Sequence, residues 1–171
     1  GVPPTGGKSK TVKIIVGIVV VAILGVIAVF LVNDSAASAA VGDCIKVNKA
    51  EAEDADVEKI ECADPAAVYK VAKKLDSASA DCPEGDYQQY MQSGSSSGFS
   101  LCLALNVEKG ECLDDPASGE AKKVACGGGG EFEVLEVIDG KSDPDACADV
   151  EGTDDGFLYT EPALVICGKK N

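Results

Sequence analysis

Eight cysteines in two similar sets of four constrain this chain more than any other feature. The first four are separated by 18, 20 and 20 residues, and the second four by 14, 21 and 20. No CxxC pair occurs and the chain has no His, so zinc-ribbon spacing and a thiol–disulfide oxidoreductase motif are both missing. The pattern therefore favours structural disulfides over a metal site for Cys44, Cys62, Cys82, Cys102, Cys112, Cys126, Cys147 and Cys167.

The residues around the cysteines repeat as well. GDCI at 42–45 matches GECL at 110–113, and KIEC at 59–62 matches KVAC at 123–126. Such agreement in both spacing and neighbours indicates a tandem duplication. It predicts two disulfide-stapled repeats, one at 41–107 and one at 108–171.

The repeat also restricts how the cysteines pair. Eight cysteines allow 105 pairings, but pairing within each repeat, with the same pattern in both, leaves three. We favour the sequential pattern, because Cys44 and Cys62 lie in consecutive strand-like runs that a hairpin would bring together. Each bridge would close a loop that contributes roughly 3 kcal/mol in the chain-entropy model. The expected pairs are 44–62, 82–102, 112–126 and 147–167.

A second constraint is an uninterrupted apolar run at 14–32, IIVGIVVVAILGVIAVFLV. As a helix these nineteen residues extend about 28 Å, close to the roughly 30 Å hydrocarbon core of a bilayer. Three Lys precede the run and Asp34 follows it. By the positive-inside rule, residues 1–13 form a cytoplasmic tail, 14–32 a transmembrane helix and 33–40 a linker to an extracytoplasmic domain. The expected location is the cell membrane, with a single pass.

Two other interpretations of this run were weighed. A cleaved signal peptide would use the Ala37-x-Ala39 pattern, but the run is longer than the usual 7–15-residue apolar region. A lipoprotein is disfavoured because Asp43 precedes the first cysteine. Within the span, Ala22, Gly25 and Ala28 recur every three residues. Small side chains at this spacing predict a face that packs against another membrane helix, although Gly and Ala are common in such helices anyway.

Composition excludes several kinds of chemistry. All 15 basic residues are Lys, and the absence of His removes imidazole bases, Ser-His or Cys-His nucleophile pairs and His-ligated haem. Residues 33–171 hold 12 Lys and all 29 acids, a net charge of −17. A surface this acidic repels nucleic acid, whose binding depends on phosphate neutralisation. We expect no catalytic residues, no cofactor, no metal and no nucleic-acid partner.

The local pattern predicts a β-dominated α+β fold in both repeats. Period-2 alternation predicts strands at 57–62, 67–75, 100–106, 122–126, 131–138 and 163–167. Leu101, Leu103 and Leu105 would share one face of their strand. Short helices are expected at 86–92 and at 144–150, the second with Asp143 as N-cap and Pro144 in the first turn. Gly127–Gly130 is interpreted as a hairpin turn, not a phosphate loop, because a strand follows it.

Other candidate features have simpler interpretations. Acids crowd the segment 143–155, but they do not match the EF-hand pattern, so a solvated loop is favoured over a calcium site. Ser95, Ser96 and Ser97 lie in a Gly/Ser loop without a base. Tyr87 and Tyr90 would form a contact patch on the short helix, or else one of them belongs to the core.

The motif string of the first repeat resembles a known family. VGDC at 41–44, the run from Ile60 to Val71, CP at 82–83 and LCLALNVEKGEC at 101–112 resemble LppU-like ectodomains of actinobacteria. The architecture, a single span with an acidic extracytoplasmic domain, is also similar to the accessory association factor of the actinobacterial cytochrome bcc–aa3 respiratory supercomplex. That likeness implies an integral membrane partner that contains haem.

Together these features predict a non-catalytic accessory subunit of a larger membrane complex, with its helix in the lipid bilayer. The alternative is a free-standing, membrane-anchored binding module for a peptide, an envelope polymer or a cation. An enzyme is disfavoured, because it would need a carboxylate pair at a set distance in a cleft, and the sequence places no two acids that way.

Overall fold

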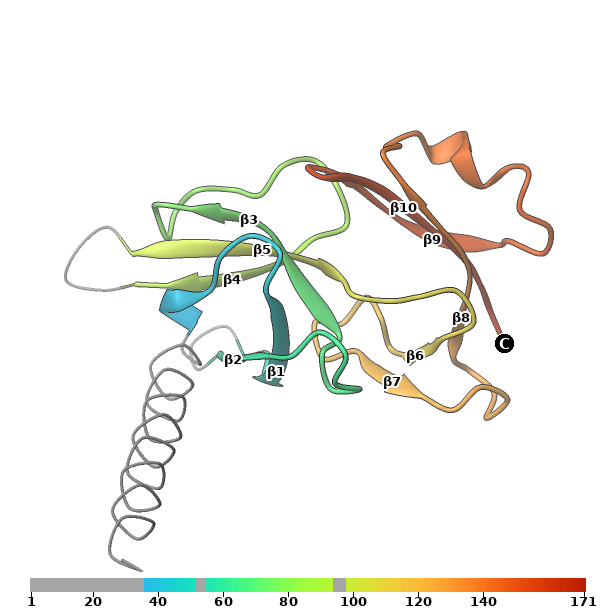
Figure 1. The fold of residues 1–171 in the computed structure, drawn as a ribbon, viewed down its shortest axis with the longest axis horizontal. Helices are drawn as coiled ribbons and strands as arrows, with labels where there is room; N and C mark the ends of the chain where they lie inside the picture. Colours follow the sequence, from blue (N-terminus) through green and yellow to red (C-terminus); the bar gives the residue numbers. More distant parts are fainter. Residues whose placement is uncertain (1–35, 52–54, 94–97) are drawn as a thin grey trace, which may run out of the picture. The chain divides into compact units, whose positions relative to one another are not determined.

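Antiparallel strands account for nearly all the regular structure of the residues that are described. A computed structural model describes residues 36–51, 55–93 and 98–171 (Figure 1). These residues belong to one compact unit, Ser35–Asn171. The predicted span at 14–32 lies outside the described residues, as do Ala22, Gly25 and Ala28. In the part that is described, no helix is long and apolar enough to cross a membrane.

The ten strands form two five-stranded sheets. The first sheet has the order β2-β1-β3-β5-β4 and the second the order β7-β6-β8-β10-β9, so the two share one topology. The first contains β1 (Cys44–Lys49), β2 (Asp56–Ile60), β3 (Tyr69–Leu75), β4 (Gln88–Gln92) and β5 (Phe99–Leu105). The second contains β6 (Cys112–Asp114), β7 (Lys122–Val124), β8 (Phe132–Asp139), β9 (Asp155–Thr160) and β10 (Ala163–Lys170).

The two sheets also share their irregularities. The register of β3 against β5 skips Ala72, and the register of β8 against β10 skips Leu135. Just before each bulge, Val71 and Val134 bond to the segments that lead into β1 and β6. The agreement in order and in bulge position supports a tandem duplication, which itself remains a prediction from the sequence.

All eight cysteines are paired, and the order is sequential in both halves. The bonds join Cys44 to Cys62, Cys82 to Cys102, Cys112 to Cys126 and Cys147 to Cys167. This is the pairing that the repeat favours. In each half one bond joins the first strand to the segment after its hairpin, and the other joins the last strand to the connection between the two strands before it.

A single apolar core runs through both sheets. Its large, fully buried side chains include Tyr69 and Leu101 from the first sheet and Phe132, Tyr159 and Ile166 from the second. The expected repeats therefore do not each enclose a separate core. Two tyrosine hydroxyls join the halves: that of Tyr69 accepts the Ala121 N–H and that of Tyr159 accepts the Leu105 N–H.

Residues 36–39, expected as part of a linker, pack onto the first sheet. The 3-10 helix η1 (Ala36–Ser38) begins this segment, and Ala36 and Ala39 are both buried. The Lys74 ammonium group donates to the carbonyl oxygens of Ala37 and Ala39 at 2.7 and 2.9 Å. Small side chains allow this close packing, so the described part of the segment belongs to the domain.

Several local predictions need correction. The helix expected at 86–92 is wrong: β4 lies there and pairs with β5 along its length, and this tertiary pairing overrides a weak local pattern. In the second half only a short 3-10 helix forms, η2 (Pro144–Cys147), although Asp143 caps it and Pro144 begins it as expected. The described residues contain no α-helix, so "β-dominated" holds and the helical part of the predicted α+β class does not.

The glycine run is a turn, but not a hairpin. It connects β7 to β8, and both of these strands pair with β6 instead of with each other. Gly127, Gly129 and Gly130 have positive φ angles, which explains the need for glycine in this connection. The prediction that Leu101, Leu103 and Leu105 share one face is also incomplete, because residues 100–105 are all buried and not only these three.

Gly168 is a position where packing leaves no room for a side chain. A Cβ there would lie 2.5 Å from the Glu133 carbonyl oxygen and would also collide with the Phe132 ring. Replacing Gly168 with alanine is therefore expected to lower the free energy of unfolding by about 1–3 kcal/mol, as overpacking does. Urea denaturation measures this. The control is Gly128→Ala, whose nearest contact is at 3.9 Å; equal losses in both variants would contradict the packing argument.

Candidate functional site

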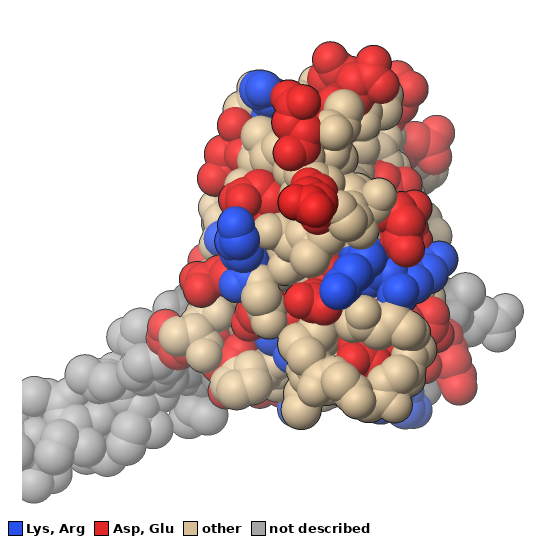
Figure 2. Space-filling view, turned by 90° about the vertical axis from the view of Figure 1, so that its right-hand side faces the viewer, with Lys and Arg blue, Asp and Glu red and all other residues tan. Residues whose placement is uncertain are grey.

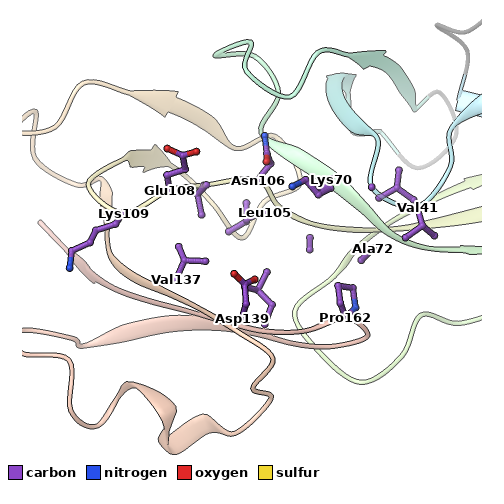
Figure 3. A pocket seen from close by; sticks show the side chains of 15 residues that line it. Val41, Lys70, Ala72, Leu105, Asn106, Glu108, Lys109, Val137, Asp139 and Pro162 are labelled. Atoms are coloured by element: carbon purple, nitrogen blue, oxygen red, sulfur yellow. The ribbon is translucent and has the colours of Figure 1, made fainter.

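In the described residues an apolar hollow with charges at its rim lies where the two sheets meet. It is a groove of about 500 Å³, within the usual size of small-molecule and peptide pockets. Figure 3 shows it between β3 on one side and the ends of β8 and β10 on the other. Its apolar lining includes Val71, Leu105, Val137 and Leu164, and its charged lining is Lys70, Glu108, Lys109 and Asp139.

The sheet topology places these residues together. β5 ends at Leu105, and the chain then crosses to β6 through residues 106–111, which form one wall of the groove. The Asn106 side chain fixes the start of this crossing by donating to the carbonyl oxygens of Cys62 and Ala67, at 3.2 and 2.8 Å. The opposite wall is formed by the C-terminal half of β8 and the N-terminal end of β10. The groove is thus a consequence of joining two like sheets.

The charges at the rim differ in whether they already have partners. Lys109 pairs with Glu136 at 2.8 Å, and the hydrogen bond from Lys109 is the main reason that the pKa of Glu136 lies below its usual value. Lys70, Glu108 and Asp139 have no side-chain hydrogen bond or ion pair among the described residues. These three charges are therefore available to a ligand.

Val41 adds an exposed apolar side chain at the edge of the groove. Its residue is 64% exposed, the largest fraction among the exposed large hydrophobic residues of the described chain, and it lines the same hollow. Exposed aliphatic side chains beside a concave apolar surface are typical of interaction sites. No local pattern marks Val41, Lys70 or Val137 as site residues, because they come together only through the packing of the two sheets.

A second hollow of about 560 Å³ lies beside η2 and is acidic. Figure 2 shows acidic side chains crowded on this end of the molecule, at the top of the view. Several of these carboxylates already serve the fold: Asp86 accepts the Leu158 N–H, Asp154 accepts the Lys170 N–H, and Asp155 pairs with the Lys170 side chain at 2.9 Å. Among the described residues no group of three potential ligands is arranged to hold a metal.

The two tyrosines of the wrongly predicted helix have separate roles. The hydroxyl of Tyr87 accepts the N–H groups of Thr160 and Glu161, and its ring packs on Tyr159 with centroids 5.1 Å apart. Tyr90 instead stacks on Phe99 at 6.2 Å. Both rings pack against the core. They do not form a contact patch, and the serines at 95–97 lie outside the described residues.

Glu131 offers a test of stability against pH. Its pKa is lowered, first by its own backbone N–H and then by the N–H of Gly127, which caps the glycine turn. A lowered carboxylate pKa stabilises the fold above the unfolded value of about 4.3, and this contribution is lost as the pH falls through the folded value. Thermal unfolding from pH 7 to pH 3 should therefore show Glu131→Gln less stable than wild type at neutral pH, with the gap closing in acid.

The matched control for this measurement is Glu151→Gln, at an exposed turn residue without a side-chain hydrogen bond in the described structure. It should follow the wild-type curve at every pH. A gap between wild type and Glu131→Gln that stays constant down to pH 3 would contradict the assignment.

Comparison of the chain with protein-family models, with curated proteins and with solved structures finds no match. The resemblances noted in the sequence therefore stand as expectations, and the function has to be argued from the site itself.

Proposed function

We propose that this chain is a non-catalytic, membrane-anchored subunit whose extracytoplasmic unit binds a partner protein through the groove between its sheets. The observation that carries the proposal is the groove, which combines an apolar floor, an exposed Val41 and three charges that have no partner among the described residues. Polar and charged groups placed around an apolar hollow provide orientation as well as affinity.

The membrane anchor in this proposal rests on the apolar run at 14–32 and on the Lys residues before it. The partner is a larger membrane complex, and the likeness to accessory factors of the cytochrome bcc–aa3 supercomplex makes a haem-containing oxidoreductase the first complex to examine. The alternative, a free-standing module for a peptide or an envelope polymer, would use the same groove. The two are distinguished by whether the chain purifies with other subunits.

The first experiment is purification of the tagged full-length chain from its native membrane in mild detergent. Mass spectrometry and visible haem absorbance identify what accompanies it. We expect a stoichiometric membrane partner with the wild-type chain, and at least a tenfold loss of that partner with Val41→Asp. A chain that purifies alone would contradict the accessory-subunit proposal.

The control makes the same substitution at another exposed valine. Val124 lies in β7, outside the groove, and is 40% exposed. Val124→Asp should retain the partner, and loss in both variants would indicate a general effect of charge. Replacement of Ala22, Gly25 and Ala28 with leucine tests the membrane part separately: weaker co-purification is expected, and wild-type retention would count against the predicted packing face.

A further inference from the structure

We propose that the groove binds an extended, basic segment of the partner polypeptide as an added strand on the free edge of β8. This inference rests on the proposed function, because it names what the groove binds.

The hydrogen-bond pattern of β8 defines the free edge. The Gly140 N–H donates to the Ala163 carbonyl at 2.8 Å, so the alternation of the ladder turns the backbone groups of Val137 and Asp139 away from β10. On that side β8 is covered only as far as Val134, which bonds to residues 110 and 111. Beyond Val134, no strand in the described residues pairs with this edge.

The corresponding position of the first sheet contacts a neighbouring segment through its side chain. Lys74 lies opposite Leu101, as Val137 lies opposite Ile166 in the second sheet. The Lys74 ammonium group donates to two carbonyl oxygens of residues 36–39, so its side chain ties a neighbouring segment to this position of the first sheet. At the corresponding position of the second sheet, Val137 lines the open groove. Val137 has a short aliphatic side chain and makes no such contact, so in the described residues this position of the second sheet stays open to the groove.

One backbone group on the free edge already has a partner within the chain. The Glu136 carboxylate interacts with the Val137 N–H, and Lys109 holds that carboxylate in place. A charged side chain on an edge strand limits unspecific pairing between sheets. The groups left for an incoming strand are the Val137 carbonyl and both backbone groups of Asp139.

The charges beside the free edge favour a basic strand as the ligand. Asp139 and Glu108 flank the free edge without partners in the described structure, and residues 35–171 contain 12 Lys against 28 acids. A segment with alternating basic and aliphatic residues would pair its charges with these carboxylates. Its aliphatic side chains would lie on the floor near Leu105 and Leu164. Strand addition of this kind takes affinity from backbone hydrogen bonds and specificity from alternate side chains.

The test uses the full-length chain in detergent micelles and fluorescence anisotropy of three labelled, end-capped peptides. KVKVKVK provides strand, charge and aliphatic groups; KVKPKVK keeps the charge but loses a backbone N–H and the extended pairing; EVEVEVE reverses the charge. We expect saturable binding of the first and at least tenfold weaker binding of the other two. Equal binding of KVKVKVK and KVKPKVK would overturn strand addition in favour of general attraction to an acidic surface.

Two variants locate the binding. Asp139→Lys should weaken KVKVKVK binding at least tenfold, whereas Asp145→Lys, an equally large change of charge at an exposed residue of η2, should change it less than twofold. Equal effects would place the peptide outside the groove and overturn the inference. If no peptide binds while partner recovery still depends on Val41, strand addition is wrong and the proposed function stands. If partner recovery is also independent of Val41, the proposed function fails as well.

Discussion

Replacing Cys82 and Cys102 together with alanine is expected to lower the free energy of unfolding by about 3 kcal/mol. The bond closes a loop of 20 residues, and a cross-link of that length removes about this much conformational freedom from the unfolded chain. Cys102 is fully buried in β5, so the double variant also loses packing in the core. Urea denaturation under non-reducing conditions measures the change, with mass spectrometry to verify the three remaining bonds.

The same arithmetic predicts the result of full reduction. Four bonds of similar loop length together contribute about 12 kcal/mol, which is comparable to the whole stability of a typical domain. The fully reduced chain should therefore lose its near-ultraviolet circular dichroism at 25 °C. A reduced chain that keeps its tertiary signal, or a double variant that loses less than 1 kcal/mol, would show that the core does not depend on the cross-links.

Truncating Tyr159 to alanine should cost about 3–5 kcal/mol, as removal of a buried aromatic side chain usually does. Tyr159 is 1% exposed and lies in β9, and its ring packs in the core that the two sheets share. Tyr159→Phe isolates the hydroxyl, which accepts the buried Leu105 N–H at 3.2 Å. Leaving that N–H without an acceptor should cost about 1–3 kcal/mol.

Tyr90→Phe is the control for the hydroxyl. Among the described residues the Tyr90 hydroxyl hydrogen-bonds the exposed Gln92 side chain alone, at 3.4 Å, so its removal should change the free energy of unfolding by less than about 0.5 kcal/mol. Chemical denaturation of the three variants gives the comparison. If Tyr159→Phe were as stable as Tyr90→Phe, the contact between the halves would not hold the sheets together as described.

The cysteine spacing was the most informative feature of the sequence, because once a repeat is recognised only a few disulfide pairings remain possible. Strands with clear alternation were also predictable, since alternation of apolar residues is a local signal: those expected at 100–106 and 163–167 correspond to β5 and β10. Segments with weak local signals were not. β4 has the sequence QQYMQ, and only its pairing with β5 makes it a strand.

The groove was not predictable from the sequence. Val41, Val71 and Val137 are far apart in the chain and are ordinary aliphatic residues by themselves. They meet because the two sheets share a core, and because the chain crosses between them after Leu105. Long-range packing of this kind leaves no periodic mark in the sequence, whereas a metal site or a catalytic motif would show as spacing between reactive residues.

We expect the groove to contact a partner in the native membrane. The most direct test places a photoreactive p-benzoylphenylalanine at position 41 of the full-length chain, with the same substitution at position 124 as the control. Irradiation of intact membranes should give one discrete adduct of higher mass from position 41 and none from position 124. An absence of adducts at 41, or the same adducts from both positions, would contradict the account.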